Sequence, residues 1–119
     1  MKAISIKQPW ASYIINGEKT IETRTRKTPY RGRIIIVSSK TPKIGITGKA
    51  LGSAKLINCR PMVKADESQA LCNLYKGAYA WILTDIEKFT APFPVKGKLG
   101  LYEISDEKLT APLTPLGKE

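Results

Sequence analysis

The sequence predicts an α+β fold, a small mixed β-barrel of about six strands with two short flanking helices. Hydrophobic periodicity gives the order strand, helix, three strands, helix and two strands, with tight turns between most strands. Because helices do not separate successive strands, a parallel doubly wound sheet is not expected. The chain has 119 residues, of which 42% are hydrophobic. This size fits a single domain over 1–119 that buries a core without disulfides or a metal.

Six segments have the residue patterns of strands. Thr20–Arg26 alternates between two faces, and Leu99 and Leu101 alternate in the last segment. The run Ile34–Val37 is apolar at every position, which is typical of a strand buried on both faces. Gly52 indicates a bulge or a sharp bend inside a longer strand. The predicted strands are Ala3–Ile6, Thr20–Arg26, Arg33–Ser38, Lys49–Cys59, Ala78–Phe89 and Lys98–Ile104.

Two short helices interrupt these strands. The first begins at Pro9, whose missing N–H is not needed in a first helical turn, and Asn16-Gly17 ends it. The second is predicted over Asp66–Tyr75, with Leu71 and Leu74 on its apolar side.

Positive charge is concentrated in the first half of the chain. Residues 1–60 carry 13 Lys and Arg against two acids, whereas 61–119 carry seven bases and eight acids. All five arginines lie in the first half. Arginine binds phosphate with a rigid fork of donors, so this distribution favours a polyanionic partner, most plausibly nucleic acid. The alternative is a solvated basic surface that aids solubility.

The sequence lacks the features of several other classes. It has no histidine, which excludes imidazole chemistry, and no Walker or Gly-x-Gly-x-x-Gly loop, so no cofactor is predicted. Cys59 and Cys72 are too few for a structural zinc site, and no metal is expected. We interpret them as reduced thiols of a cytoplasmic protein rather than a disulfide. No apolar run approaches the length of a membrane span, and the N-terminus lacks a signal-peptide core.

The segment Gly17–Arg24 is the best candidate for a functional site. It joins a predicted helix to a predicted strand and combines Lys19 with Glu22 and Arg24, two residues apart on one strand face. An ammonium, a carboxylate and a guanidinium in this arrangement can hold a small polar group or a phosphodiester. The alternative is a surface strand with an ion pair of little energetic value.

Two aromatic features add to this candidate. Gln8 carries an amide able to read a base edge, and Trp10 can close one side of a pocket, although a core role for the tryptophan is the alternative. Tyr30 lies within the basic segment 26–33, a pattern that suits backbone contacts combined with base stacking.

Three segments resemble the ASCH domain family of the PUA-like superfamily. They are Ile4-Ser5-Ile6-Lys7-Gln8-Pro9-Trp10-Ala11-Ser12, Gly17-x-Lys19-Thr20-x-Glu22-x-Arg24 and Tyr30-Arg31-Gly32-Arg33. The resemblance is close over residues 4–38 and looser beyond. It implies a PUA-like β-barrel with a cleft lined by the second segment, and binding of RNA or another nucleic acid.

The same resemblance raises an enzymatic alternative. One ASCH-like subgroup hydrolyses N4-acetylcytidine with a lysine, a threonine three residues later and a more distant glutamate, and other members are ribonucleases. Lys19 matches the lysine, but Glu22 occupies the threonine position, and Glu67 is only the nearest candidate for the glutamate. A hydrolase built on this chain therefore has Lys19 and Glu22 as its candidate catalytic pair.

We predict a module, most simply a monomer, that binds RNA, or less favourably DNA, or a modified nucleoside, in a basic cleft. Gln8, Trp10 and Glu22 are expected to shape a pocket for one base, with Ser38 reaching the same cleft. A contact with an acidic protein partner is the third alternative. The residues expected to contact phosphates are Lys19, Arg24, Arg26, Arg31 and Arg33.

Overall fold

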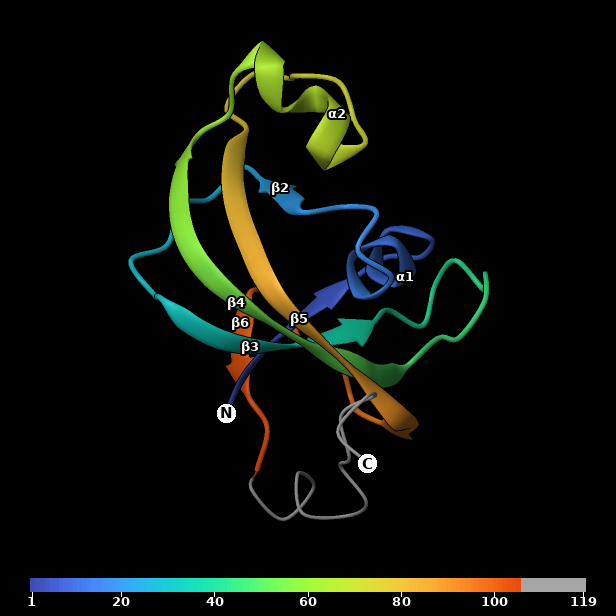
Figure 1. The fold of residues 1–119 in the computed structure, drawn as a ribbon. Coiled ribbons are helices and arrows are strands. Elements are labelled where there is room, and N and C mark those ends of the chain that lie inside the picture. Colours follow the sequence, from blue (N-terminus) through green and yellow to red (C-terminus); the bar gives the residue numbers. More distant parts are fainter. Residues whose placement is uncertain (106–119) are drawn as a thin grey trace.

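Six strands form one mixed sheet in the computed structural model, which describes residues 1–105 (Figure 1). The strand order is β2-β5-β4-β3-β1-β6; β1 and β3 are parallel, and the other neighbouring pairs are antiparallel. The elements are β1 (Lys2–Ile6), α1 (Trp10–Ile15), β2 (Ile21–Arg24), β3 (Gly32–Ser38), β4 (Lys49–Pro61), the 3₁₀ turn η1 (Lys64–Asp66), α2 (Glu67–Ala70), β5 (Tyr79–Pro94) and β6 (Leu101–Glu103). The predicted element order is confirmed. Residues 106–119 of the predicted domain lie outside the described part.

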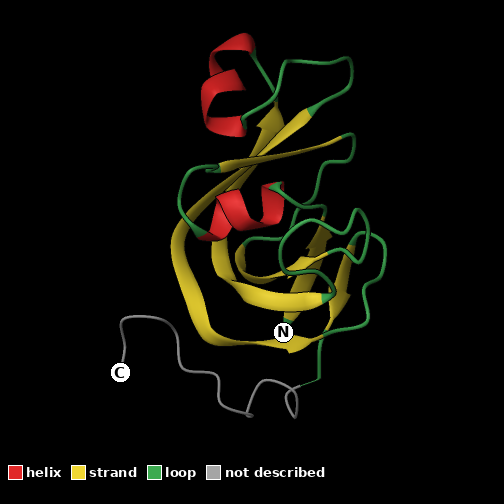
Figure 2. Ribbon diagram, turned by 90° about the vertical axis from the view of Figure 1, so that its right-hand side faces the viewer, coloured by secondary structure: helices red, strands yellow, loops and turns green. Residues whose placement is uncertain are grey.

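The two longest strands curl the sheet into a half-barrel (Figure 2). Their pairing shifts register at three places, one of them at Gly52. A Cβ atom at Gly52 would lie 2.3 Å from the carbonyl oxygen of Glu87 and 2.9 Å from Cδ1 of Ile15. Glycine is therefore required at this point, where β4 passes close to β5 and α1. β2 and β6 form the two edges of the sheet, so the barrel stays half open, and the predicted α+β class is confirmed.

The core lies inside the curl, and α1 packs against it. Ile14 of α1 joins a buried cluster that also contains Trp81 and Leu83 of β5. Within the run Ile34–Val37, alternate side chains enter two different clusters, one on each face of the sheet. The prediction of a strand buried on both faces is thus confirmed, because α1 covers one face and the other is packed by β5 and β6 side chains.

The second predicted helix is wrong in length. The structure has one 3₁₀ turn followed by one turn of α-helix, and Leu71 ends the helix with a left-handed backbone conformation (φ 55°). The carboxylate of Glu67 accepts a hydrogen bond from the N–H of Leu74 at 2.6 Å, which folds the chain back over the helix end. Leu71 and Leu74 are consequently exposed instead of forming an apolar helix face.

Two predicted strands are also shorter than expected. The segment predicted over Thr20–Arg26 is a strand only over Ile21–Arg24, and the last strand starts at Leu101. Leu99 is 99% exposed in the preceding loop, so its predicted alternation with Leu101 is wrong. Among residues 1–105, no helix is long and apolar enough to span a membrane.

Candidate functional site

A cleft of about 840 Å³ opens where the half-barrel fails to close. Its walls come from the end of β1, the start of α1, β2, the end of β3, the turn after α2 and the loop before β6. The lining residues are Ser5, Ile6, Lys7, Trp10, Lys19, Glu22, Thr23, Arg24, Ser38, Ser39, Lys40, Gly48, Cys72, Tyr75, Val95, Lys96, Gly97, Lys98, Leu99 and Gly100. Segments far apart in the sequence therefore meet around one concavity.

Backbone hydrogen bonds hold Lys19 at the base of this cleft. Its N–H donates to the carbonyl of Tyr13 at 3.0 Å, which anchors the residue to the end of α1. The next residue, Thr20, donates to the carbonyl of Gln69 at 3.0 Å and accepts from the N–H of Leu83 at 2.9 Å. The lysine is thus placed by α1, α2 and β5 together. Its side chain is only 2% exposed.

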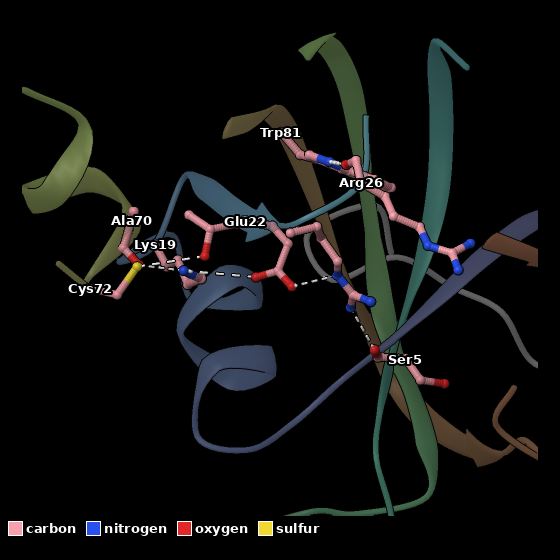
Figure 3. A network of polar contacts seen from close by, with 9 residues as sticks. Ser5, Lys19, Glu22, Arg26, Ala70, Cys72 and Trp81 are labelled. Carbon is pink, nitrogen blue, oxygen red and sulfur yellow. Dashed lines mark hydrogen bonds and ion pairs between the residues drawn. The ribbon is translucent and has the colours of Figure 1, made fainter. Parts of the chain in front are cut away.

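A chain of polar contacts crosses the base of the cleft (Figure 3). Nζ of Lys19 donates to the carbonyl of Ala70 and lies 3.8 Å from Oε1 of Glu22. The other carboxylate oxygen, Oε2, accepts from Nε of Arg24 at 3.1 Å. Nη2 of Arg24 then donates to the carbonyl of Ser5 at 2.8 Å. β1 pairs with β6 through Lys2, Ala3 and Ile4, and Ser5 lies beyond this pairing. Arg24 therefore connects the edge strand β2 to β1 through its side chain, without backbone pairing between the two strands.

Burial and charge act in opposite directions on Lys19. Removal from water disfavours the ammonium and lowers the pKa of Lys19, while the Glu22 carboxylate, and to a smaller degree Cys72, oppose that lowering. Thr23 Oγ1 lies 3.6 Å from Sγ of Cys72, so the thiol is held against the same wall. An amine with a lowered pKa beside a carboxylate in a cleft is typical of a functional site.

The cleft lining is strongly biased toward cations. Besides Lys19 and Arg24 it contains Lys7, Lys40, Lys96 and Lys98, whereas Glu22 is its single acid among the described residues. Two aromatic side chains, Trp10 and Tyr75, also line the cleft and are 39% and 40% exposed. Both rings therefore present surface to a ligand.

The structure brings together five of the predicted site residues. These are Trp10, Lys19, Glu22, Arg24 and Ser38. The hydroxyl of Ser38 is fully buried and bonds both the N–H and the carbonyl of Lys49. It therefore shapes the cleft wall and has no free donor for a ligand.

The other predicted site residues lie outside the cleft lining. The buried amide of Gln8 donates to Ser12 Oγ and the Ile46 carbonyl and accepts from the Ser12 N–H, so it ties α1 to the loop at 41–48. Arg26 is exposed, and its backbone carbonyl accepts from Nε1 of the Trp81 indole. Its side chain is directed away from the polar chain described above (Figure 3).

Arg31 and Arg33 bond nearby groups of the fold. The Arg31 guanidinium donates to the carbonyls of Thr28 and Tyr30. Arg33 forms an ion pair with Asp85 and also donates to Ser53 Oγ at 3.0 Å, which joins β3 to β4 and β5. Sequence spacing cannot reveal this ion pair, because its partners are 52 residues apart.

Several cleft residues were not predicted from the sequence. Lys7, Lys40, Lys96 and Lys98 stand singly or in pairs in loops, and Tyr75 was placed in a helix that ends earlier. The one available signal was the basic, glycine-containing segment Lys96-Gly97-Lys98, where two lysines flank a glycine. In residues 1–105, no group of three His, Cys, Asp or Glu side chains is placed to hold a metal ion.

Comparison with known proteins identifies the domain. A sequence model of the ASCH domain matches residues 4–93. The crystal structure of ASCH from Zymomonas mobilis has a TM-score of 0.70 and 21% identity, and the match covers 92% of this chain and 90% of that chain. A point-mutant form of the protein from the same organism has a TM-score of 0.70 and 18% identity, covering 95% and 98% of the two chains. At this identity the similarity shows the fold.

Two curated relatives share the region as well. Activating signal cointegrator 1 from Mus musculus and from Homo sapiens is in each case 22% identical over 129 residues, which cover 87% of this chain. The match covers 22% of each relative, so this chain spans about a fifth of their length.

Proposed function

Because the chain belongs to the ASCH domain family, we propose that it is an RNA-binding module whose cleft receives one base while surrounding lysines contact phosphates. The observation that carries this proposal is the composition of the cleft lining. Among residues 1–105, six Lys and Arg side chains from distant segments converge there, against one carboxylate that is itself paired. Cations that only keep a protein soluble are expected to be spread over its surface, whereas cations that bind a polyanion are expected to be concentrated in a cleft.

The cleft also offers separate places for a base and for its phosphates. Lys7, Lys40, Lys96 and Lys98 are exposed, so their ammonium groups can contact phosphates without being dehydrated. Trp10 and Tyr75 present ring surface to the same space, which suits base stacking. The Glu22 carboxylate repels phosphate, so the base of the cleft is better suited to a nucleobase.

The exposed arginines outside the cleft extend the proposed contact surface. Arg26 and Arg31 lie in the segment that follows β2, and Arg31 keeps donors beyond the two that bond carbonyls. Arg33 forms an ion pair with Asp85. We therefore expect Arg33 to contribute less to phosphate binding than an unpaired arginine would. Their contribution is separable from that of the cleft by mutation.

The test compares RNA binding of matched double variants. Nuclease-treated protein is titrated into fluorescently labelled single-stranded RNA at several salt concentrations, and anisotropy gives the affinity. Lys96→Ala with Lys98→Ala removes two cleft cations, and Lys43→Ala with Lys55→Ala removes two exposed lysines outside the cleft. We expect the cleft variant to flatten the log–log salt slope by about 1.4, at about 0.7 for each lost phosphate contact on a single strand. The control slope should stay near that of the unmodified protein.

Equal slopes in the two double variants would contradict binding through the cleft. A third variant, Arg26→Ala with Arg31→Ala, reports the share of the exposed arginines in the same assay. The same titration with single-stranded DNA separates an RNA module from a general single-strand binder, because only RNA carries the 2′-hydroxyl.

A hydrolase is the second candidate function, and one observation favours it. Lys19 is a buried amine with a lowered pKa that lines the cleft next to Glu22. Such an amine can act as a general base toward a substrate amide or a ribose hydroxyl. The test incubates the protein with N4-acetylcytidine and, separately, with RNA, and follows both by chromatography. Product formed by the unmodified protein and lost in Lys19→Met, with the fold retained, would support this candidate; intact substrates would leave the binding function alone.

A further inference from the structure

Lys19, Glu22 and Arg24 form a row of hydrogen-bonding groups on the cleft wall. Lys19 Nζ lies 3.8 Å from one oxygen of the Glu22 carboxylate, and Arg24 Nε lies 3.1 Å from the other oxygen. The carboxylate is therefore flanked on opposite sides by a cationic donor. Toward a ligand, the row reads donor, acceptor, donor.

Each group in the row retains capacity for a ligand. The Lys19 ammonium has three N–H donors and gives one to the Ala70 carbonyl. Arg24 uses Nε and Nη2, and among the described residues Nη1 bonds no partner. A carboxylate offers about four lone-pair sites, more than its two neighbours occupy. All three residues line the cleft, so a ligand bound there lies next to the groups that retain this capacity.

We propose that this row selects uracil, by pairing with the imide edge that its Watson–Crick face presents. This inference rests on the proposed function and names the base that the cleft receives. The imide edge carries the opposite sequence of groups, a carbonyl oxygen, an N–H and a second carbonyl oxygen. Its N3–H donates to Glu22, and its O4 and O2 accept from the two cations. Three charge-assisted hydrogen bonds form, and no polar atom of the edge is left unpaired.

The other bases match the row less well. Cytosine has a lone pair at N3 where uracil has an N–H. In the position that uracil occupies, it would therefore place an acceptor against the carboxylate. In a shifted position, its O2 would have no donor. Guanine presents a carbonyl oxygen and then two donors, one of which meets a cation. Adenine offers one acceptor and one donor and fills two of the three positions. A buried polar group left unpaired weakens binding, so each alternative is disfavoured relative to uracil.

The location of the row supports a base contact over a phosphate contact. Lys19 and Glu22 are both buried, whereas the other cleft lysines are exposed at its margin. A phosphate would place its negative charge against Glu22, while a neutral imide is attracted by all three groups. Trp10 and Tyr75 line the same cleft and can stack on the bound ring.

The first experiment varies the ligand and uses the unmodified protein. Affinities are measured for short oligouridylate, oligocytidylate, and oligouridylates that carry a single methyl group at N3 or at C5 of every base. The N3 methyl group removes the N–H that pairs with Glu22, and the C5 methyl group adds the same bulk while leaving the edge intact. We expect oligouridylate to bind roughly tenfold more tightly than oligocytidylate, and the N3-methylated strand to lose about the same factor. The C5-methylated strand should keep its affinity.

Equal affinity for uridine and cytidine strands, or equal loss from the two methyl positions, would overturn the proposal and leave RNA binding intact. Free UMP and CMP are titrated in parallel by NMR. A preference for UMP with no binding of any strand would support recognition of uracil while rejecting the RNA module. In the Glu22→Gln variant the preference for uridine over cytidine should fall to about twofold or less, because an amide no longer attracts the N3–H as a charge does. A folded variant that keeps the full preference would also overturn the assignment.

Discussion

Asp66→Asn tests how η1 and α2, which precede the cleft-lining turn with Cys72 and Tyr75, are attached to the sheet. The Asp66 carboxylate accepts two hydrogen bonds from the Arg60 guanidinium, both at 2.8 Å, and a third from the N–H of Val63 at 2.9 Å. Arg60 belongs to the end of β4, so the pair fixes the turn that precedes α2. The Ala70 carbonyl at the end of α2 in turn holds Lys19. A local ion pair thus supports one side of the cleft.

The size of the effect follows from the protonation of this carboxylate. Hydrogen bonds from Arg60, and then from the Val63 N–H, lower the pKa of Asp66 from its usual 3.8 to about 2. At about 1.36 kcal/mol per pKa unit, this lowering corresponds to about 2.4 kcal/mol of folding stability. Asp66 is buried, but the side chain of Arg60 is 40% exposed and solvent screens the pair. We therefore expect Asp66→Asn to reduce the free energy of unfolding by about 1.5 kcal/mol at neutral pH.

The pH dependence distinguishes this cause from a simple loss of packing. Because the pKa is lower in the folded state, the contribution is complete above the unfolded pKa and disappears as pH falls from about 4 to about 2. Urea denaturation of both proteins is measured at neutral pH and at several values down to about pH 2. The difference between them should shrink toward zero at the acidic end. A difference that is absent at neutral pH, or that stays constant across the range, would refute the reasoning.

Three further predictions concern the sheet itself. Gly52→Ala should destabilise the fold by about 3 kcal/mol, because the added Cβ would lie 2.3 Å from the carbonyl oxygen of Glu87 and the backbone would have to move. A thermal-denaturation midpoint equal to that of the unmodified protein would contradict the required close approach. Tyr102→Phe removes the hydroxyl that lies 2.7 Å from Ser5 Oγ between β6 and β1 and should cost about 1 kcal/mol in urea denaturation. Burial raises the pKa of Tyr102, so its phenolate absorbance should appear later than that of exposed tyrosines in an alkaline titration, and coincident titration would argue against its burial.

Local patterns were sufficient for much of the fold. The apolar run Ile34–Val37 has no polar face, and only a strand covered on both sides satisfies it. Gly52 interrupts a strand in the sequence, and the structure places it at a shift of register. The predicted second helix is longer than the observed one because Leu71 and Leu74 keep helical spacing in the sequence. In the structure, the Glu67 carboxylate accepts a hydrogen bond from the N–H of Leu74, and the helix ends earlier. Hydrophobic spacing in the sequence does not predict a bond of this kind.

The candidate site divides in the same way. Lys19, Glu22 and Arg24 lie within six residues, so their proximity follows from the two-residue period of a strand and from the turn before it. The order of the contacts, with the carboxylate between two cations, depends on the Ala70 and Ser5 carbonyls from other elements. These anchors are 51 and 19 residues away, and sequence spacing carries no information about them.

The sequence by itself determined the α+β class, the element order, the basic character and the ASCH motif, because each depends on neighbours along the chain. Only the tertiary structure decided which cations share the cleft. Lys7 and Lys98 converge there because the sheet curls and leaves its edges unpaired, whereas Arg33 of β3 forms an ion pair with Asp85 of β5, on the far side of β4. Charge in a sequence is a sum over residues, but a binding site depends on the distances between them, and long-range packing sets those distances.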